Sequence, residues 1–367
     1  MTRMGHHIDP DVAVARTLDP AFYTSEGAFA ATRDKVFART WQWLGDLRDV
    51  DGPGALAPRT LLPGLLDEPL LLARDGDGVL RCLSNVCTHR GNLLVRAPCR
   101  AADIRCGYHS RRFDLAGRMT FMPGFAQARG FPTADDDLPQ ASFCEWAGHG
   151  FAALSPSAPA GEFLADVIAR TVSPSPATYV HDPSSDRDYE VAAHWALYVE
   201  NYLEGFHIPY VHPGLASALD LASYTTELFT YASLQQVLAR DGEHALEGTR
   251  IAAQYWFVFP NLMLNFYTWG LSVNLVEPQT TMRTRVRFRS YVRDAGLRGT
   301  GAGSALDRVE QEDEAVVGSV ARGIRARLFR GGRGGGPYSP EHETGVHHFH
   351  RLLARFLAEG ERDGSGV

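Results

Sequence analysis

Two short motifs, each pairing a cysteine with a histidine, constrain this 367-residue chain more than any other feature. The first reads Cys87-Thr-His89-Arg-Gly and the second reads Cys106-Gly-Tyr-His109. Brought together, two such turns can hold two irons, with both cysteines on one iron and both histidines on the other. Because imidazole is neutral, this cluster carries less negative charge than an all-cysteine cluster and accepts an electron more readily. The motifs therefore predict a two-iron cluster.

A structural zinc site is the alternative interpretation, because zinc takes the same four ligands. Zinc fingers group two cysteines and then two histidines, whereas each motif here mixes the two residue types. The other three cysteines are Cys82, Cys99 and Cys144. Five cysteines are an odd and sparse set for a disulfide scaffold, so we expect these three to be buried thiols.

A second group of potential metal ligands lies in residues 200–213, which read ENYLEGFHIPYVHP. Helical spacing places four polar side chains on one helix face: Glu200, Asn201, Glu204 and His207. On a regular helix His212 would point away from His207, but Pro209 forbids a regular continuation and a kink can bring the imidazoles together. Two convergent imidazoles and one carboxylate form the facial triad of non-heme Fe(II) sites.

The carboxylate of this triad is expected on a helix predicted at 304–330. Asp313 lies in the middle of a narrow apolar arc of five residues: Val309, Val316, Val317, Val320 and Ile324. Glu310 and Glu312 lie at the edges of that arc. A buried carboxylate must be paired or coordinated, so Asp313 is the predicted ligand. Pairing of Asp313 with an arginine, or ligation by Glu312 instead, are the alternatives.

The rest of the chain has the composition of an ordinary globular protein, with 44% hydrophobic and 22% charged residues. Residues 47–155 hold short apolar runs separated by Gly, Asp and Pro, with a turn at Asp75–Gly78, which indicates a small antiparallel β domain. The other expected elements are helices at 20–45, 190–220 and 344–359 and long β runs across 251–293.

The paired motifs resemble the Rieske domain of ring-hydroxylating oxygenases, whose loops read C-x-H-R-G and C-x-Y-H-G. Asn92 and Tyr108 stand near the positions where respiratory-type Rieske proteins carry two further cysteines, which favours the oxygenase type. The chain departs from the family at Ser110-Arg111, where Gly-Trp is usual, so the hydrogen bonding of that loop is expected to differ.

Residues 200–213 resemble the family motif N-x-x-D/E-x-x-H-x₄-H, and Glu312-Asp313 falls where the late Glu-Asp pair of the family supplies the third ligand. The resemblance implies that the mononuclear iron is bound by three residues: His207, His212 and Asp313. It places Glu204 at the bridging position between the two metal centres and Asn201 as a further catalytic residue.

The resemblance covers most of the chain and implies an α+β fold in three parts. These are an N-terminal helical segment (1–46) packing on the catalytic domain, a small antiparallel β Rieske [2Fe-2S] domain (47–157) and a helix-grip catalytic domain (158–367). It also implies a homotrimer. Since no G-x-G-x-x-G βαβ unit is present, a separate NAD(P)H-dependent reductase, with or without a ferredoxin, is expected to supply electrons.

The expected function is that of a terminal oxygenase, which uses O₂ to hydroxylate or oxidatively dealkylate a small organic substrate. The single-subunit length and Glu204 are most similar to oxygenases of carnitine- and choline-type amines, and aromatic side chains facing a cavity can cage a quaternary ammonium. The alternatives are an aromatic-ring mono- or dihydroxylating oxygenase and a non-catalytic Rieske electron carrier.

Charge and hydropathy bear on partners and location. A net charge of −7 argues against a nucleic-acid partner. No apolar run has the length of a bilayer-spanning helix, so no membrane association is expected. The N-terminus lacks the basic and apolar pattern of a secretory signal, so the cytoplasm is the expected location.

Overall fold

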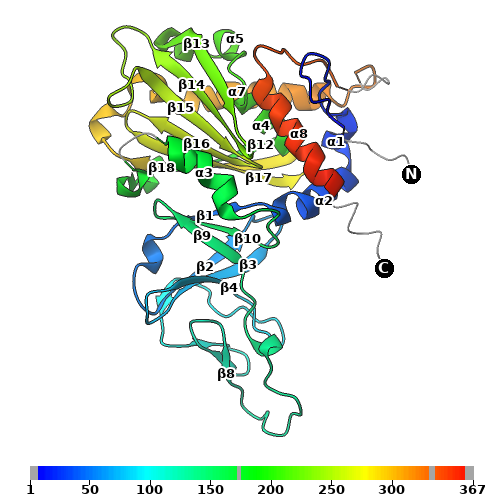
Figure 1. The fold of residues 1–367 in the computed structure, drawn as a ribbon, viewed down its shortest axis with the longest axis vertical. Helices are drawn as coiled ribbons and strands as arrows, with labels where there is room; N and C mark the ends of the chain where they lie inside the picture. The colour runs from blue at the N-terminus through cyan, green and yellow to red at the C-terminus, as the bar shows by residue number, and fades with distance from the viewer. Residues whose placement is uncertain (1–6, 172–174, 330–334, 360–367) are drawn as a thin grey trace. The chain divides into compact units, whose positions relative to one another are not determined.

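The computed structural model describes residues 7–171, 175–329 and 335–359, and the chain divides into two compact units. The smaller unit is Ala38–Ser157, and the larger unit combines Met1–Phe37 with Ala158–Val367. Figure 1 shows strands throughout the smaller unit and a broad sheet with helices in the larger one. Among the described residues, none of the helices has both the length and the apolar character that crossing a bilayer requires.

The smaller unit consists of three antiparallel sheets, with strand orders β1-β10-β9, β4-β3-β2-β5 and β6-β7-β8. Its strands are β1 (Gln42–Asp46), β2 (Ala55–Leu61), β3 (Glu68–Arg74), β4 (Leu80–Ser84), β5 (Cys99–Arg100), β6 (Ile104–Arg105), β7 (Arg112–Phe113), β8 (Met119–Phe121), β9 (Ser142–Trp146) and β10 (His149–Ala153). The predicted turn joins β3 to β4: Asp75 Oδ1 accepts the backbone N–H groups of Asp77 and Val79, and Gly78 has a φ of 82°.

The helix predicted at 20–45 ends earlier than expected. It comprises α1 (Pro20–Thr24) and α2 (Glu26–Lys35), separated by Ser25, whose hydroxyl caps α2. Strand β1 follows and pairs with β10 through Trp43 and Phe151. Gly45, with a φ of 102°, lies at a bulge in β1 and has left-handed backbone that a helix cannot contain. Tertiary pairing therefore overrides the helical periodicity of this segment.

The three cysteines outside the paired motifs differ in exposure. Cys82 is buried, and burial raises the pKa of its thiol to about 12. Cys144 is half-buried, and desolvation raises its pKa to about 11. Cys99 is exposed at the start of β5, so the expectation of a buried thiol is wrong there, because the short strand lies at the edge of its sheet.

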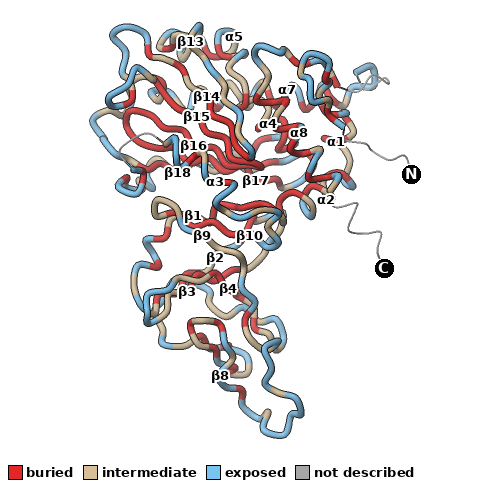
Figure 2. The backbone as a smooth tube through the Cα atoms, in the orientation of Figure 1, coloured by how far each residue is buried: buried red, intermediate tan, exposed pale blue. Residues whose placement is uncertain are grey.

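The larger unit is built on one antiparallel sheet of order β11-β18-β17-β16-β15-β14-β13, with β12 also paired to β18. Its strands are β11 (Val180–His181), β12 (Arg187–Val191), β13 (Leu219–Leu228), β14 (Ala232–Ala239), β15 (Ile251–Val258), β16 (Leu262–Tyr267), β17 (Gly270–Thr280) and β18 (Arg283–Val292). Figure 2 shows that the central strands of this sheet are largely buried. This sheet forms the surface on which the polar residues of the larger unit are positioned.

The β region predicted at 251–293 is confirmed, but its second run divides into β16 and β17. The division lies before Gly270, which has a φ of 149° and whose Cβ, if present, would lie 2.1 Å from the carbonyl oxygen of Tyr291. Only glycine permits this approach of two strands. On β18 the alternating basic residues Arg285 and Arg287 pair with the buried Glu277 carboxylate at 2.6 and 3.1 Å.

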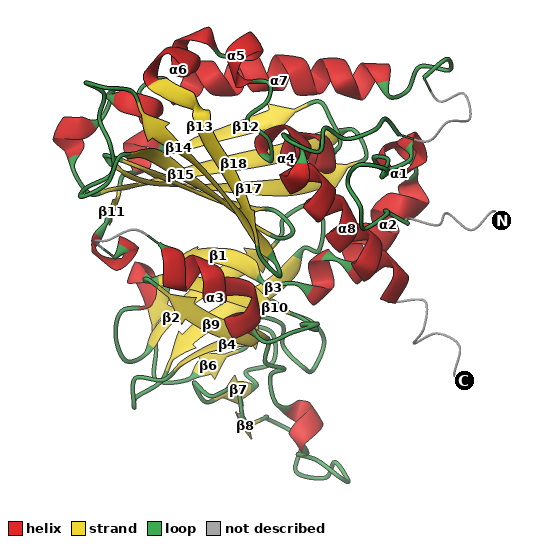
Figure 3. Ribbon diagram, turned by 45° about the horizontal axis from the view of Figure 1, so that its top comes forward, coloured by secondary structure: helices red, strands yellow, loops and turns green. Residues whose placement is uncertain are grey.

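Six further α-helices occur in the described part of the larger unit: α3 (Ala160–Arg170), α4 (Trp195–Tyr202), α5 (Ile208–Val211), α6 (Pro213–Ala218), α7 (Leu306–Gly323) and α8 (Thr344–Glu359). Helix α3 packs on β14 and β15, whereas α4 packs on β17 and α7; Figure 3 shows α3 and α7 on opposite sides of the sheet. Helix α8 agrees with its predicted bounds, while α7 is shorter than the predicted 304–330, of which residue 330 lies outside the described residues.

Candidate metal centres and adjoining cavity

The segment between α4 and α5 departs from the single helix predicted over 190–220. Helix α4 ends at Tyr202, so Glu204 and His207 lie in a turn and not on one helix face. Gly205 permits this turn, since a Cβ there would lie 2.5 Å from the ring of Tyr224. Pro209 occupies the first turn of α5, where proline is well tolerated, and so does not kink a continuous helix as expected.

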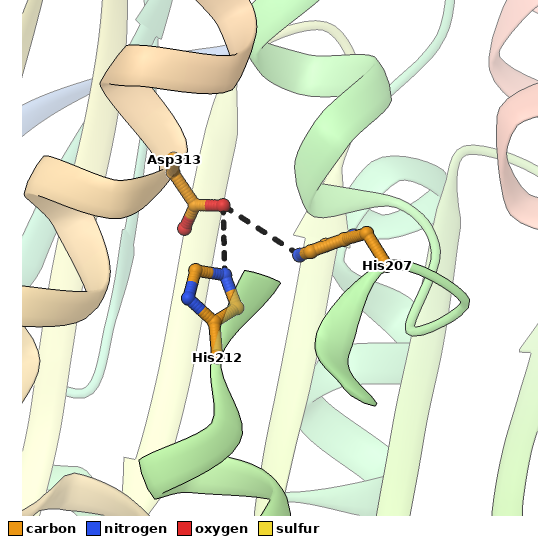
Figure 4. A group of neighbouring side chains, drawn as sticks. All are labelled: His207, His212 and Asp313. Atoms are coloured by element: carbon orange, nitrogen blue, oxygen red, sulfur yellow. Dashed lines mark hydrogen bonds and ion pairs between the residues drawn. The ribbon is translucent and has the colours of Figure 1, made fainter. Parts of the chain in front are cut away.

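The break between the helices nevertheless brings three predicted ligands together (Figure 4). One potential ligand atom from each of His207, His212 and Asp313 lies within 4.8 Å of the others. Nε2 of His212 is 3.0 Å from Asp313 Oδ1, and Nε2 of His207 is 3.5 Å from the same oxygen. Two imidazoles and one carboxylate facing a common point are the donor set of a facial Fe(II) site.

The opposite nitrogen of each imidazole is held by a second carboxylate. Nδ1 of His207 lies 2.7 Å from Glu204 Oε1, and Nδ1 of His212 lies 2.7 Å from Glu312 Oε2. Glu312 also accepts a hydrogen bond from Arg308 at 2.9 Å. Hydrogen bonds of this kind fix the imidazole tautomer and leave Nε2 free for a metal. The residues present therefore fit a mononuclear iron, with Glu312 hydrogen-bonded to Nδ1 of His212.

Asp313 lies on α7, but the helix is not buried as its apolar arc predicted. Val317 and Ile324 are buried, whereas Val320 between them is 45% exposed, so the arc does not face the core along its whole length. Within the described ranges, no arginine lies within ion-pairing distance of Asp313, and its ion-pair partners are His207 and His212. Glu310, expected at the edge of the arc, is the most buried carboxylate of α7, at 5% exposed.

A cavity adjoins the three clustered side chains, between α4, α7 and the sheet. Its described lining residues are Tyr198, Asn201, Tyr202, Glu204, His207, Ile208, His212, Leu215, Tyr224, Gln235, Tyr255, Asn265, Tyr267, Asn274, Phe288, Ala302, Leu306, Val309, Glu310 and Asp313. No lysine or arginine is among them. The aromatic side chains of the lining are Tyr198, Tyr202, Tyr224, Tyr255, Tyr267 and Phe288.

Several lining residues belong to no recognisable sequence motif. Phe288 and Glu310 reach the cavity because the sheet and α7 face each other, an arrangement that local periodicity does not report. By contrast, Phe206 and Tyr210, which flank the iron-binding motif in sequence, are 47% and 78% exposed and do not line the cavity.

In the smaller unit the two Cys/His loops are closed by the same pair of backbone hydrogen bonds. In the first, Gly91 N–H donates to Cys87 O at 2.9 Å and Cys87 N–H donates to Asn92 O at 2.9 Å. In the second, Ser110 N–H donates to Cys106 O at 3.0 Å and Cys106 N–H donates to Arg111 O at 2.8 Å. The two turns therefore share the same backbone hydrogen bonds, although the histidine is two residues after the cysteine in the first and three residues after it in the second.

The side chains of these loops are arranged in like pairs. Nδ1 of His89 lies 3.2 Å from Nδ1 of His109, and the Cys87 and Cys106 thiols are close enough to shift each other's pKa. Burial on its own would raise the pKa of the Cys106 thiol. Hydrogen bonds from backbone N–H groups, including that of Tyr108, outweigh burial and lower this pKa. Adjacent thiols facing adjacent imidazoles fit a [2Fe-2S] cluster in which each iron takes like ligands.

The two residues that depart from the Rieske pattern have definite structural roles. Ser110 has a φ of 62°, which is left-handed backbone that favours glycine, the usual family residue. Arg111 is 2% exposed, donating from Nη1 to Thr88 Oγ1 at 2.6 Å and from Nη2 to Asp136 Oδ1 at 2.8 Å. It therefore ties the second loop to the first and places a buried cation beside the cluster ligands.

Replacing Arg111 with methionine is expected to lower the reduction potential of the cluster by tens of millivolts, because a nearby positive charge favours the more negative reduced state. Protein-film voltammetry measures the potential directly. Arg112→Met is the matched control, since Arg112 is adjacent but exposed, with Asp103 3.6 Å away. Equal potentials in both variants would contradict the electrostatic role of Arg111.

Comparison with known families identifies both units. Residues 40–132 match the model of the Rieske [2Fe-2S] domain, and residues 179–359 match the catalytic domain of the ring hydroxylating alpha subunit. The chain therefore belongs to the Rieske oxygenases and is an oxidoreductase with a Rieske cluster and a mononuclear iron. This family relies on a separate electron donor and acts on small-molecule substrates.

Curated relatives match along nearly the whole chain. Chloroplastic choline monooxygenase of Arabidopsis thaliana is 28% identical, with 96% of this chain and 86% of the relative covered. The carnitine monooxygenase oxygenase subunit of Escherichia coli (strain K12) is 28% identical, with coverages of 94% and 95%. Both relatives are monooxygenases.

Solved structures confirm the predicted fold class. The quaternary ammonium Rieske monooxygenase CntA, in complex with L-carnitine, superposes with a TM-score of 0.75 at 23% identity, covering 95% of this chain and 97% of that one. Naphthalene 1,2-dioxygenase from Rhodococcus sp. gives a TM-score of 0.70 at 18% identity, covering 94% and 95%. The match to the catalytic domain favours an enzyme over a non-catalytic electron carrier.

Proposed function

We propose that this chain is the terminal oxygenase component for a small organic cation, preferably a quaternary amine, which it hydroxylates or oxidatively dealkylates. The observation that carries the proposal is the cavity beside His207, His212 and Asp313. Its described lining combines aromatic rings with carboxylates and contains no lysine or arginine. Such a lining attracts a cation through ring faces and negative charge. The names of the choline and carnitine relatives support the same class.

We assign the mononuclear iron to His207, His212 and Asp313. The [2Fe-2S] cluster is assigned to four ligands: Cys87, His89, Cys106 and His109. When bound, these groups supply electrons and a site where O₂ is activated. The assignment rests on the convergent Nε2 atoms and carboxylate in the larger unit and on the like-paired thiols and imidazoles in the smaller unit.

Within the cavity, the protein holds its aromatic rings in place by hydrogen bonds at their hydroxyls. The Tyr202 hydroxyl contacts Asn265 Oδ1 at 2.6 Å, and the Tyr224 hydroxyl donates to Gln235 Oε1 at 2.8 Å. Anchored phenols leave their ring faces available to a methylated ammonium and lose little entropy on binding. These residues orient the substrate, while the buried sheet behind them excludes water.

Glu204 remains the proposed link between the two metal centres, and Asn201, which lines the cavity, remains a proposed catalytic residue. Glu204 accepts hydrogen bonds from both Nδ1 and the backbone N–H of His207, at 2.7 and 3.0 Å. In a homotrimer, Glu204 would also accept a hydrogen bond from His109 of a neighbouring subunit, so that electrons pass between subunits. Inter-subunit electron transfer has been described for a quaternary ammonium Rieske monooxygenase of the same fold, which supports this arrangement.

The proposed organisation has the three parts expected from the sequence, 1–46, 47–157 and 158–367, except that the smaller unit begins at Ala38 and so includes strand β1 from the first part. The electron donor is proposed to be a separate NAD(P)H-dependent reductase, with or without a ferredoxin. A cytoplasmic location stays a prediction, since the choline relatives carry a chloroplastic designation.

The substrate class is tested by reconstituting the iron-loaded protein with a reductase and measuring O₂ consumption and products. Choline, L-carnitine and γ-butyrobetaine form the cationic arm, and naphthalene forms the aromatic arm. We expect product from at least one cation, detected by mass spectrometry, and none from naphthalene. Products from naphthalene alone would overturn the proposal and favour an aromatic-ring oxygenase.

A further inference from the structure

Glu310 is a buried acid on the wall of the cavity for which neither metal centre accounts. It lies on α7, one turn before Asp313, and is 5% exposed. Its Oε2 accepts a hydrogen bond from the Tyr198 hydroxyl at 2.7 Å, whereas Oε1 is buried and has no hydrogen-bond donor among the described residues. A buried carboxylate oxygen without a donor is costly, and such a group in a cavity wall indicates that a ligand supplies the missing partner.

The charges around Glu310 show which ligand would suit it. The charged and titratable groups that act on it are Tyr198 of α4, Tyr189 of β12, and Asp313 and Glu314 of its own helix. None of these is a cation. Burial raises the pKa of Glu310 to about 8, and the neighbouring carboxylates add to the effect, so these groups do not compensate its charged form. A cation entering the cavity provides that compensation.

We propose that Glu310 is the residue that selects the positive charge of the substrate. The cationic group of a small amine would occupy the cavity near Glu310 while the tyrosine ring faces contact its methyl groups. This inference rests on the proposed function, because it assumes that the cavity receives the substrate. It adds a specific residue to the general aromatic and acidic character of the lining.

The hydrogen bond from Tyr198 to Glu310 makes it possible to distinguish charge selection from a purely structural role of Glu310. If Glu310 served only to accept the Tyr198 hydrogen bond, glutamine would replace it, since its amide oxygen accepts the same bond. Glu310→Gln removes the negative charge and keeps the shape of the side chain. A charge-selecting role therefore predicts that Glu310→Gln loses affinity for the charged ligand but not for the neutral one. A structural role predicts that the substitution affects the affinity for both ligands to the same extent.

The test uses choline and its neutral isostere 3,3-dimethylbutan-1-ol, which differ by a single positive charge. Isothermal titration calorimetry of the iron-loaded protein measures both dissociation constants. In Glu310→Gln the constant for choline is expected to rise about tenfold to a hundredfold, while that for the neutral isostere changes less than about threefold. Iron content and circular dichroism are measured for each variant to verify the fold.

Asp307→Asn is the matched control, because Asp307 lies on the same helix but is exposed and does not line the cavity. We expect its dissociation constants to equal those of the wild type. If choline binds Glu310→Gln as tightly as the wild type, the role of Glu310 is overturned and the proposed function stands. If the wild-type protein binds only the neutral isostere, and L-carnitine and γ-butyrobetaine also fail to bind, both the proposed function and the role of Glu310 are overturned.

Discussion

Asp313→Ala is expected to reduce the iron content from about three to about two atoms per chain and to abolish turnover, a loss of at least about a thousandfold. The reason is geometric: Asp313 Oδ1 is the only carboxylate oxygen that faces Nε2 of both His207 and His212 among the described residues. Two imidazoles alone are a weak site for Fe(II). Metal analysis and low-temperature EPR measure the two centres separately, and the reduced Rieske signal should persist.

Two further variants make this result specific. Asp307→Ala removes an exposed carboxylate from the first turn of the same helix and should retain all the iron. Glu312→Gln weakens the carboxylate that holds Nδ1 of His212 and should lower iron affinity about 10- to 100-fold without eliminating the site. Full iron content and normal turnover in Asp313→Ala would reject Asp313 as the third ligand.

Glu204→Gln is expected to retain both metal centres and to lose about 99% of turnover. Glu204 orients His207 through two hydrogen bonds but does not itself face Asp313. Replacing Glu204 should therefore leave the iron bound. Its proposed task is to connect the imidazole of His207 to a cluster histidine of a neighbouring subunit. Single-turnover mixing of the reduced protein with O₂ and substrate measures how fast the cluster is reoxidised.

The control for this variant is Glu227→Gln, which removes an exposed carboxylate paired with Arg170 on the surface. We expect wild-type iron content in both variants and slow cluster reoxidation only in Glu204→Gln. Normal product formation by Glu204→Gln would show that electron transfer from the cluster does not depend on this carboxylate, whatever the oligomeric state.

The metal-binding motifs were predictable because their ligands are close in sequence. Cys87 and His89, like Cys106 and His109, are separated by one or two residues, so a single turn brings each pair to one place. The strand Arg283–Val292 was predictable for a similar reason, since alternation along one segment reports two faces of a sheet. By contrast, the helix predicted to carry Glu204 and His207 ends before both of them, at Tyr202, and Gly205 then packs closely against Tyr224 of β13.

The sequence by itself determined which residue types this protein uses for metal binding and which family it resembles, because ligand chemistry and local spacing are properties of short segments. Only the tertiary structure decided which carboxylates serve which purpose. Asp313, Glu312 and Glu310 lie within one turn of α7, yet one faces both imidazoles, one holds His212 from behind and one is buried on the cavity wall. Their roles depend on how α7 packs against α4 and the sheet, and packing between distant segments leaves no local pattern in the sequence.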